Sequence, residues 1–144
     1  MSEQDHEVVH AYAVGDQVAA ASYHLTRDSL VRYAGASGDF NAIHYRDDVA
    51  AEVGLPGVLA HGMLTMGLAV QPVIDWLGDP TLVDGYQVRF TRPVVVDPVA
   101  GADLTVTAKI GQIDEAAGTA RIDLTTTVGD DTVLGKAQVR VRLP

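Results

Sequence analysis

Three segments in the second half of the chain alternate apolar and polar residues, and this pattern constrains the fold most. The segments are Ala102–Ile110, Ala120–Val128 and Val133–Leu143, with turn-like sequences at 114–118 and 129–131 between them. Successive side chains of an extended chain point to opposite faces, so a period of two is typical of strands with one buried face. The short turns predict an antiparallel meander, and Tyr86–Thr91 is expected to be a fourth strand.

Helical patterns precede these strands. A helix is expected at Gly62–Leu77, where apolar residues lie nearly all round, and such a helix is wrapped by other structure. A strand is expected at Val18–Leu25, and shorter helices at Arg27–Ala36 and Asp47–Val53. Helices followed by a run of strands indicate an α+β fold, with a sheet curled around the apolar helix. The 144 residues are expected to form one domain, with residues 1–12 as a flexible or peripheral start.

Composition excludes several classes of function. Nineteen acidic residues against ten basic ones give a net charge of −9, which argues against binding to nucleic acid or to an anionic membrane. The absence of cysteine excludes disulfide scaffolds, thiolate metal sites and cysteine nucleophiles. We see no secretory signal and no run of about 18 apolar residues, so we expect a soluble cytoplasmic protein.

The negative charge is unevenly distributed along the chain. Residues 1–88 carry twelve acids and three bases, whereas residues 89–144 carry seven of each. The first part therefore supplies the whole net charge, and the basic residues concentrate in the second part.

The loop at 37–44 carries the polar residues of greatest interest. Asp39 and His44 are five residues apart, between two expected helices, so a loop that folds back can bring them together. A carboxylate beside an imidazole is a common acid–base pair, because each group exchanges a proton readily and each affects the other. Asn41 lies between them and could bond the loop backbone or orient a partner. The alternative is that Asp39 caps the loop and that His44 is an ordinary half-buried histidine.

A second candidate lies where the apolar helix begins. Free N–H groups at a helix N-terminus favour negative charge, and Gly62 would let a ligand approach the backbone closely, as in an oxyanion site. The alternative is that this loop simply needs a flexible residue, with His61 as a loop or interface residue. A metal site made by Asp39, His44 and His61 is conceivable, but no ligand spacing supports it, and no metal is expected.

Both segments resemble signatures of the MaoC-like family of (R)-specific enoyl-thioester hydratases and dehydratases. Residues 33–44, which read YAGASGDFNAIH, resemble the hydratase motif, whose aspartate and histidine form the catalytic dyad and fall on Asp39 and His44. The motif's asparagine falls on Asn41, and Ala42 replaces a proline that is common in the family. Residues 59–65, LAHGMLT, resemble the second signature, which gives the N–H of Gly62 the role of polarising a thioester carbonyl. Residues 85–94 are similar to the family's next strand.

The resemblance implies a fold, a reaction and partners. The implied fold is the hot-dog fold, an antiparallel sheet wrapped around a long central helix, in subunits that pair side by side. The implied reaction is the reversible interconversion of trans-2-enoyl and (3R)-hydroxyacyl thioesters of CoA or acyl carrier protein, with no cofactor. The pattern is closest to the catalytic subunits of actinobacterial (3R)-hydroxyacyl-carrier-protein dehydratases, so the partner is expected to be a second copy or a related hot-dog subunit.

Two alternatives stay open at this point. A hot-dog thioesterase would use a similar tunnel and hydrolyse the thioester, and a non-catalytic acyl-binding subunit would keep the fold alone. Beyond the dyad and Gly62, we expect substrate contacts from five residues: Asn41, His61, Met63, Arg89 and Arg92. Because CoA and acyl carrier proteins are anionic, Arg89 and Arg92 are expected near the mouth of the tunnel.

Overall fold

The structure, a computed structural model, describes residues 12–144 and shows one long helix packed against a single sheet. The elements in chain order are β1 (Gln17–Leu25), α2 (Arg27–Ser37), α3 (Asp47–Glu52), α4 (Gly62–Leu77), β2 (Val83–Phe90), β3 (Ala102–Asp114), β4 (Thr119–Val128) and β5 (Asp131–Arg142). Single 3₁₀ turns lie at Ala42–His44 and Pro80–Leu82. Residues 1–11, which include most of the start expected to be flexible or peripheral, lie outside the described residues.

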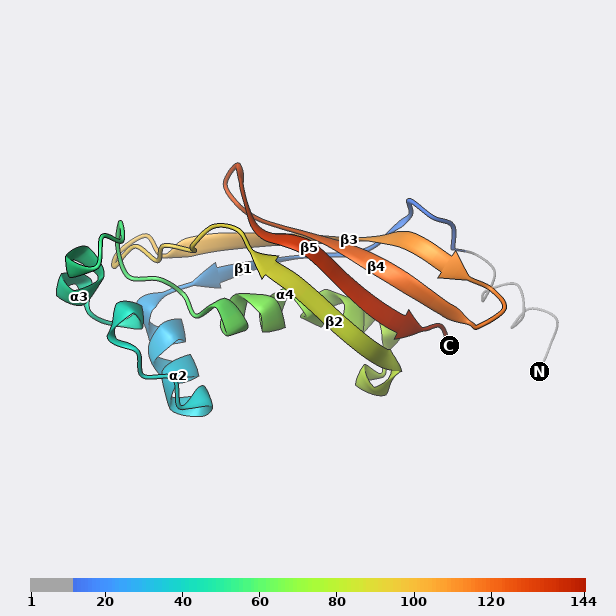
Figure 1. The fold of residues 1–144 in the computed structure, drawn as a ribbon, viewed down its shortest axis with the longest axis horizontal. Coiled ribbons are helices and arrows are strands. Elements are labelled where there is room, and N and C mark those ends of the chain that lie inside the picture. The colour runs from blue at the N-terminus through green and yellow to red at the C-terminus, as the bar shows by residue number, and fades with distance from the viewer. Residues whose placement is uncertain (1–11) are drawn as a thin grey trace.

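The sheet has five antiparallel strands in the order β1-β3-β4-β5-β2. The expected meander is therefore confirmed, because β3, β4 and β5 follow one another in space as in sequence. Figure 1 shows α4 along one face of this sheet, with α2 and α3 together at one end. The expected α+β class and the arrangement of a sheet on a long helix, the hot-dog fold, are confirmed.

A bulge explains why β3 is longer than its sequence pattern. The pairing of β3 with β4 shifts between Ile110 and Gln112, so the alternation of buried and exposed residues ends there although the strand continues to Asp114. A Cβ at Gly111 would collide with the side chains of Asp123 and Arg121, so glycine lets the bulged backbone lie against that ion pair.

A second irregularity corrects one expectation about β5. The sequence pattern placed Leu134 on the polar face, opposite Val133, but both side chains are buried at 2% exposure. The pairing of β5 with β4 shifts nearby, and Lys136 has a positive φ of 44°, so the strict alternation fails at this position. The two neighbouring apolar residues consequently both help to line a pocket, which is described below.

The core lies between α4 and the inner face of the sheet. Ala69 and Val73 of α4 are fully buried, as are Leu104, Val106 and Ile122 of the facing strands. Each fully buried valine or leucine side chain contributes roughly 1.5–3 kcal/mol. These contacts fix the position of the N-terminus of α4 relative to the sheet.

A half-buried tyrosine also joins α4 to the edge strand β2. The hydroxyl of Tyr86 donates a hydrogen bond of 2.7 Å to the carbonyl of Met66. Burial raises the pKa of Tyr86, so its hydroxyl keeps its proton and remains a donor.

The sheet covers α4 on one side, and residues on the other side of the helix stay accessible to solvent. Along the other side runs an apolar stripe in which Met63 is 60% exposed and Gly67 is exposed, with Met66, Val70 and Ile74 half-buried. Within residues 12–144, Figure 1 shows no helix or strand on the side of α4 that faces away from the sheet. We call these five residues the α4 stripe.

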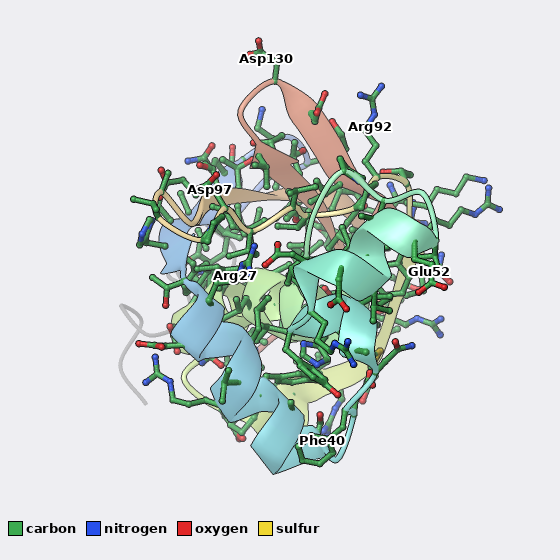
Figure 2. All side chains as sticks on the ribbon, turned by 90° about the vertical axis from the view of Figure 1, so that its left-hand side faces the viewer. Arg27, Phe40, Glu52, Arg92, Asp97 and Asp130 are labelled. Carbon is green, nitrogen blue, oxygen red and sulfur yellow. The ribbon has the colours of Figure 1, made fainter. Side chains whose placement is uncertain are left out.

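Side-chain contacts hold the end of the molecule that carries α2 and α3. Arg27 of α2 donates through Nε to the carbonyl of Val96 at 2.6 Å and pairs with Asp47 of α3 at 2.9 Å (Figure 2). The hydrogen bond from Arg27 lowers the pKa of Asp47, so this carboxylate stays charged. The ion pair therefore ties the start of α3, where the preceding loop ends, to the start of α2. Among the described helices, none is long and apolar enough to cross a membrane.

Candidate active site

The loop after α2 is built from a chain of side-chain to backbone hydrogen bonds. Gly38, with a φ of 78°, ends α2 in the left-handed conformation that favours glycine. The hydroxyl of Ser37 accepts from the N–H of Asp39 at 3.1 Å, and the carboxylate of Asp39 accepts from the N–H of Asn41 at 3.2 Å. Asn41 in turn accepts from the N–H of Ile43 at 3.2 Å and begins the 3₁₀ turn. Asn41 thus shapes the loop that presents the two flanking residues.

This loop brings the predicted pair together. His44 Nε2 lies 3.9 Å from Asp39 Oδ2, and the two side chains are 10% and 51% exposed. The distance is too long for a direct hydrogen bond. It is short enough for one water molecule to contact both groups, with its oxygen at an ordinary hydrogen-bond distance from each.

A backbone carbonyl determines the tautomer of His44. His44 Nδ1 lies 2.7 Å from the carbonyl oxygen of Leu59, in the segment that leads into α4. A carbonyl oxygen can only accept, so Nδ1 must carry the hydrogen. In the neutral imidazole the free lone pair is then on Nε2, the nitrogen that faces Asp39. His44 is therefore arranged to accept a proton on that side.

His61 lies beneath the pair instead of beside it. Its side chain is buried at 1% exposure, and its ring stacks on that of His44 with centroids 3.8 Å apart and planes 22° apart. His61 Nε2 donates to the backbone carbonyl of Asp39 at 3.1 Å. Other side chains cover the ring, and a direct contact of His61 with substrate stays a prediction.

The three groups considered for a metal site do gather in space. Asp39, His44 and His61 each offer a ligand atom within 4.8 Å of the others. Two stacked rings, however, direct their lone pairs into two nearly parallel planes, and one ion cannot lie in both. One nitrogen of each ring also donates to a backbone carbonyl. The geometry fits acid–base chemistry better than a shared metal ion.

A pocket of about 310 Å³ opens beside His44, between the N-terminus of α4 and the strands β2 and β5. Gly62, the first residue of α4, lies on its wall, where the first N–H groups of a helix have no partner within the helix. The ring of Phe90 rests on this glycine, and a Cβ at position 62 would lie 2.9 Å from Phe90 Cε1. The pocket therefore combines a base with free N–H donors on a mainly apolar wall.

Comparison with known proteins gives the family. The family described as "MaoC like domain" matches residues 9–128, which is most of the chain. The chain belongs to the MaoC-like family. The resemblance seen in its two sequence signatures is thereby confirmed.

Individual relatives agree with this assignment. The chain is 35% identical over 82 residues to the 3-hydroxyacyl-thioester dehydratase X of Mycobacterium tuberculosis, covering 57% of this chain and 28% of that protein. It is 29% identical over 119 residues to the 3-hydroxybutyryl-CoA dehydratase of Methylorubrum extorquens, covering 81% of this chain and 73% of that protein. A solved MaoC-like dehydratase superposes with a TM-score of 0.91 at 38% identity, covering 94% of this chain and 42% of that one. The chain thus spans less than half the length of two of these relatives.

Not all expected substrate contacts lie at the pocket of this MaoC-like chain. Arg92 lies on the pocket wall and pairs with Asp131 at 2.8 Å, near the β4–β5 turn that carries Asp130 (Figure 2). Arg89 is exposed on β2, and Met63 is exposed on the α4 stripe. Neither is among the residues that line this pocket.

The structure adds residues that sequence reasoning missed. Thr65 lies on the pocket wall one turn into α4, is 2% exposed, and has a hydroxyl without a partner in the described part of the chain. The available signal was a polar residue three positions after Gly62, in the otherwise apolar first half of the helix. The contribution of the Leu59 carbonyl had no such signal, because every residue has a carbonyl.

Proposed function

We propose that this chain catalyses the reversible syn addition of water to trans-2-enoyl thioesters, giving (3R)-hydroxyacyl thioesters. The observation that carries the proposal is the position of His44 Nε2, 3.9 Å from the carboxylate of Asp39 and on the wall of a pocket that also holds the N-terminus of α4. Membership of the MaoC-like family and the similarity to two dehydratases support the same reaction.

The proposed chemistry assigns one step to each member of the pair. A water molecule between Asp39 and His44 gives one proton to His44 Nε2 while its oxygen bonds to C3 of the substrate. Asp39 accepts a hydrogen bond from the other hydrogen of this water and so orients it. The imidazolium of His44 then gives the proton to C2 on the same face, which completes the addition of one water and leaves His44 neutral.

The N-terminus of α4 is the proposed site of the thioester carbonyl. Bond formation at C3 moves negative charge onto that oxygen as an enolate. The N–H of Gly62 and the positive end of the helix dipole stabilise this charge in a pocket with a largely apolar wall. The hydroxyl of Thr65 lies on the same wall and offers a further donor toward the acyl group.

Two rival activities can be separated in one assay. With crotonyl-CoA, a hydratase removes the enone absorbance without releasing thiol, whereas a thioesterase releases free thiol. A non-catalytic acyl-binding subunit changes neither signal. We expect loss of absorbance with no thiol. Thiol release, or no change with the chain alone and with a related hot-dog subunit, would reject the proposal.

The thioester carrier, CoA or acyl carrier protein, is anionic, and we propose that Arg92 contacts it. Arg92 combines a position on the pocket wall with a side chain that is 62% exposed. Its ion pair with Asp131 is exposed, and such pairs exchange partners at little cost. Arg89, away from the pocket wall, is expected to contribute less.

We also propose that a second hot-dog subunit covers the α4 stripe. Exposure of a continuous apolar surface on a helix is unfavourable in water, and the stripe begins at Met63, directly after Gly62. β2 is at the edge of the sheet, so its outer backbone groups are free to pair with another strand. A second copy of this chain or a related hot-dog subunit could cover the α4 stripe and pair with β2.

A further inference from the structure

His61 has a position that the proposed reaction does not use. It is the residue directly before α4, it is buried at 1% exposure, and it is not on the pocket wall. Its ring lies between two others: His44 stacks on it at 3.8 Å, and Tyr33 meets it edge-on at 4.7 Å with planes 62° apart. The ring of His44 therefore packs on the ring of His61, which Tyr33 in turn holds in place.

The hydrogen bonds of His61 are unusual for a buried histidine. Its Nε2 lies 3.1 Å from the carbonyl oxygen of Asp39, so Nε2 carries the hydrogen and donates. In the neutral ring Nδ1 is then an acceptor, and it has no partner in the part of the chain that the structure describes. A buried acceptor without a partner is unfavourable for folding, and an apolar ring of similar size would avoid this cost.

His61 is thus linked to both members of the catalytic pair by different interactions. The stack restricts rotation of the His44 ring about its Cβ–Cγ bond. The hydrogen bond from His61 Nε2 holds the backbone carbonyl of Asp39. His44 is also held at Nδ1 by the carbonyl of Leu59. The stack and the hydrogen bond to Leu59 together hold the His44 ring so that its Nε2 points toward the carboxylate of Asp39.

We propose that His61 is a positioning residue that sets the relative orientation of Asp39 and His44. The inference deepens the proposed hydratase function and rests on it. Since His61 makes no contact with the pocket, it acts on the reaction only through the geometry of the pair. A misplacement of about 1 Å in a catalytic group can lower a rate by ~10²-fold.

Two substitutions separate the two interactions. His61→Phe keeps a ring that can stack on His44 and removes the donor to Asp39, whereas His61→Gln keeps an amide N–H near the position of Nε2 and removes the ring. For each variant we expect kcat to fall by ~10- to 10²-fold with KM changed less than about threefold. We expect the melting temperature of His61→Phe to stay at or above that of the wild type. His24→Gln, at an exposed histidine of β1, is the matched control and should keep the wild-type rate.

A second measurement does not depend on activity. The ¹⁵N shifts of the His44 imidazole report which nitrogen carries the hydrogen, and the wild type should show the Nδ1–H form alone. His61→Gln, which removes the ring stacked on His44, should let the His44 ring turn away from the Leu59 carbonyl and show a mixture of forms. If the wild type does not hydrate crotonyl-CoA, the proposed function fails, but this spectrum still tests the positioning role. Wild-type kcat in both variants, an unchanged His44 spectrum in His61→Gln, or loss of folding in both would overturn the inference.

Discussion

The backbone carbonyl of Leu59 determines which nitrogen of His44 is available for catalysis. It accepts from Nδ1 at 2.7 Å, and so the basic nitrogen of the neutral ring is the one beside Asp39. The carboxylate is half-exposed and the imidazole is nearly buried. The pair therefore combines a rigid base with a more accessible group that can hold water.

Substitutions at the catalytic pair should separate activity from stability. Asp39→Asn removes the charge, and His44→Asn keeps an N–H near Nδ1 for the bond to Leu59 while removing Nε2. Each should lower kcat for crotonyl-CoA by about 10²–10⁴-fold, the usual contribution of acid–base groups. The melting temperatures should stay near that of the wild type. A variant that keeps a near-wild-type rate would contradict the assignment of that residue.

Substitution at Gly62 should act through Phe90. A Cβ at position 62 would press on the ring of Phe90, 2.9 Å away, but alanine keeps the N–H that we assign to the thioester carbonyl. Gly62→Ala should therefore lower kcat/KM, by up to ~10²-fold. The double variant Gly62→Ala, Phe90→Ala should recover part of that loss relative to Phe90→Ala alone. No recovery would show that the glycine is needed for another reason.

At the scale of residues, the sequence predicted the pairing of two residues within the 37–44 loop, but it did not predict contacts between this loop and other segments. Asp39 and His44 could be paired because they lie only five positions apart, in one loop. The stack of His44 on His61 joins two segments, and the hydrogen bond from His61 to Asp39 spans 22 positions. Sequence pattern alone carries no information on such contacts, so His61 was interpreted as a substrate contact.

At the scale of elements, periodicity predicted the order of helices and strands and missed the places where the backbone departs from it. The helix at Gly62–Leu77 and the β3-β4-β5 meander were predicted directly from apolar spacing. The bulge near Gly111 and the positive φ of Lys136 could not be predicted from apolar spacing. A one-residue shift moves all later side chains to the opposite face, so the spacing no longer shows which face is buried. The second shift brings Leu134 into the pocket wall.

The loop between β2 and β3 should make stability depend on pH. The N–H groups of Ala100 and Val99 donate to the carboxylate of Asp97 at 2.8 Å, and these bonds lower its pKa. A lowered pKa in the folded state adds stability above the unfolded value, near 3.9, that is lost as pH falls through the folded value. Asp97→Asn keeps an acceptor without the charge. Its melting temperature should be lower than that of the wild type at pH 7 and converge with it below about pH 4. An equal difference at every pH would contradict this origin.

At the scale of the whole molecule, the α4 stripe and the edge strand β2 indicate an assembly. The sequence shows that α4 is apolar nearly all round, but not that its own sheet leaves one side uncovered. That side becomes visible only when the layers are placed (Figure 1). The surface proposed to bind a partner could therefore be predicted only from the arrangement of the helix and the sheet, and not from a sequence motif.

A charge on the α4 stripe should disrupt this assembly. Gly67 has no heavy atom within 4 Å of a Cβ built on it, so alanine fits and should stabilise the helix by about 0.5–1 kcal/mol. Gly67→Arg should convert the assembled species to a monomer, while Gly67→Ala retains the wild-type size unless the partner approaches the backbone closely. Sedimentation of the chain, alone and with a related subunit, measures this. A wild type that is monomeric in both conditions would contradict the proposed partner.

The uneven distribution of charge along the chain bears on how an anionic substrate binds. Seven of the ten basic residues lie in 89–144, and Arg92 brings one of them to the pocket. Arg92→Glu should raise KM for crotonyl-CoA several-fold at low salt, and 0.5 M salt, at which the Debye length is about 4 Å, should reduce the difference. Arg89→Glu is the comparison at a residue away from the pocket wall and should have a smaller effect. Equal KM values for Arg92→Glu and the wild type at low salt would reject the role.

The central claim is that Asp39 and His44 add water to one face of an enoyl thioester. The most direct test is the hydration of crotonyl-CoA in deuterated water, followed by NMR and chiral analysis of the 3-hydroxybutyryl product. We predict a 3R hydroxyl and one deuterium at C2 on the same face, with product formed at least ~10²-fold more slowly by Asp39→Asn and by His44→Asn. A 3S product, addition to opposite faces, or undiminished product from these variants would contradict the account.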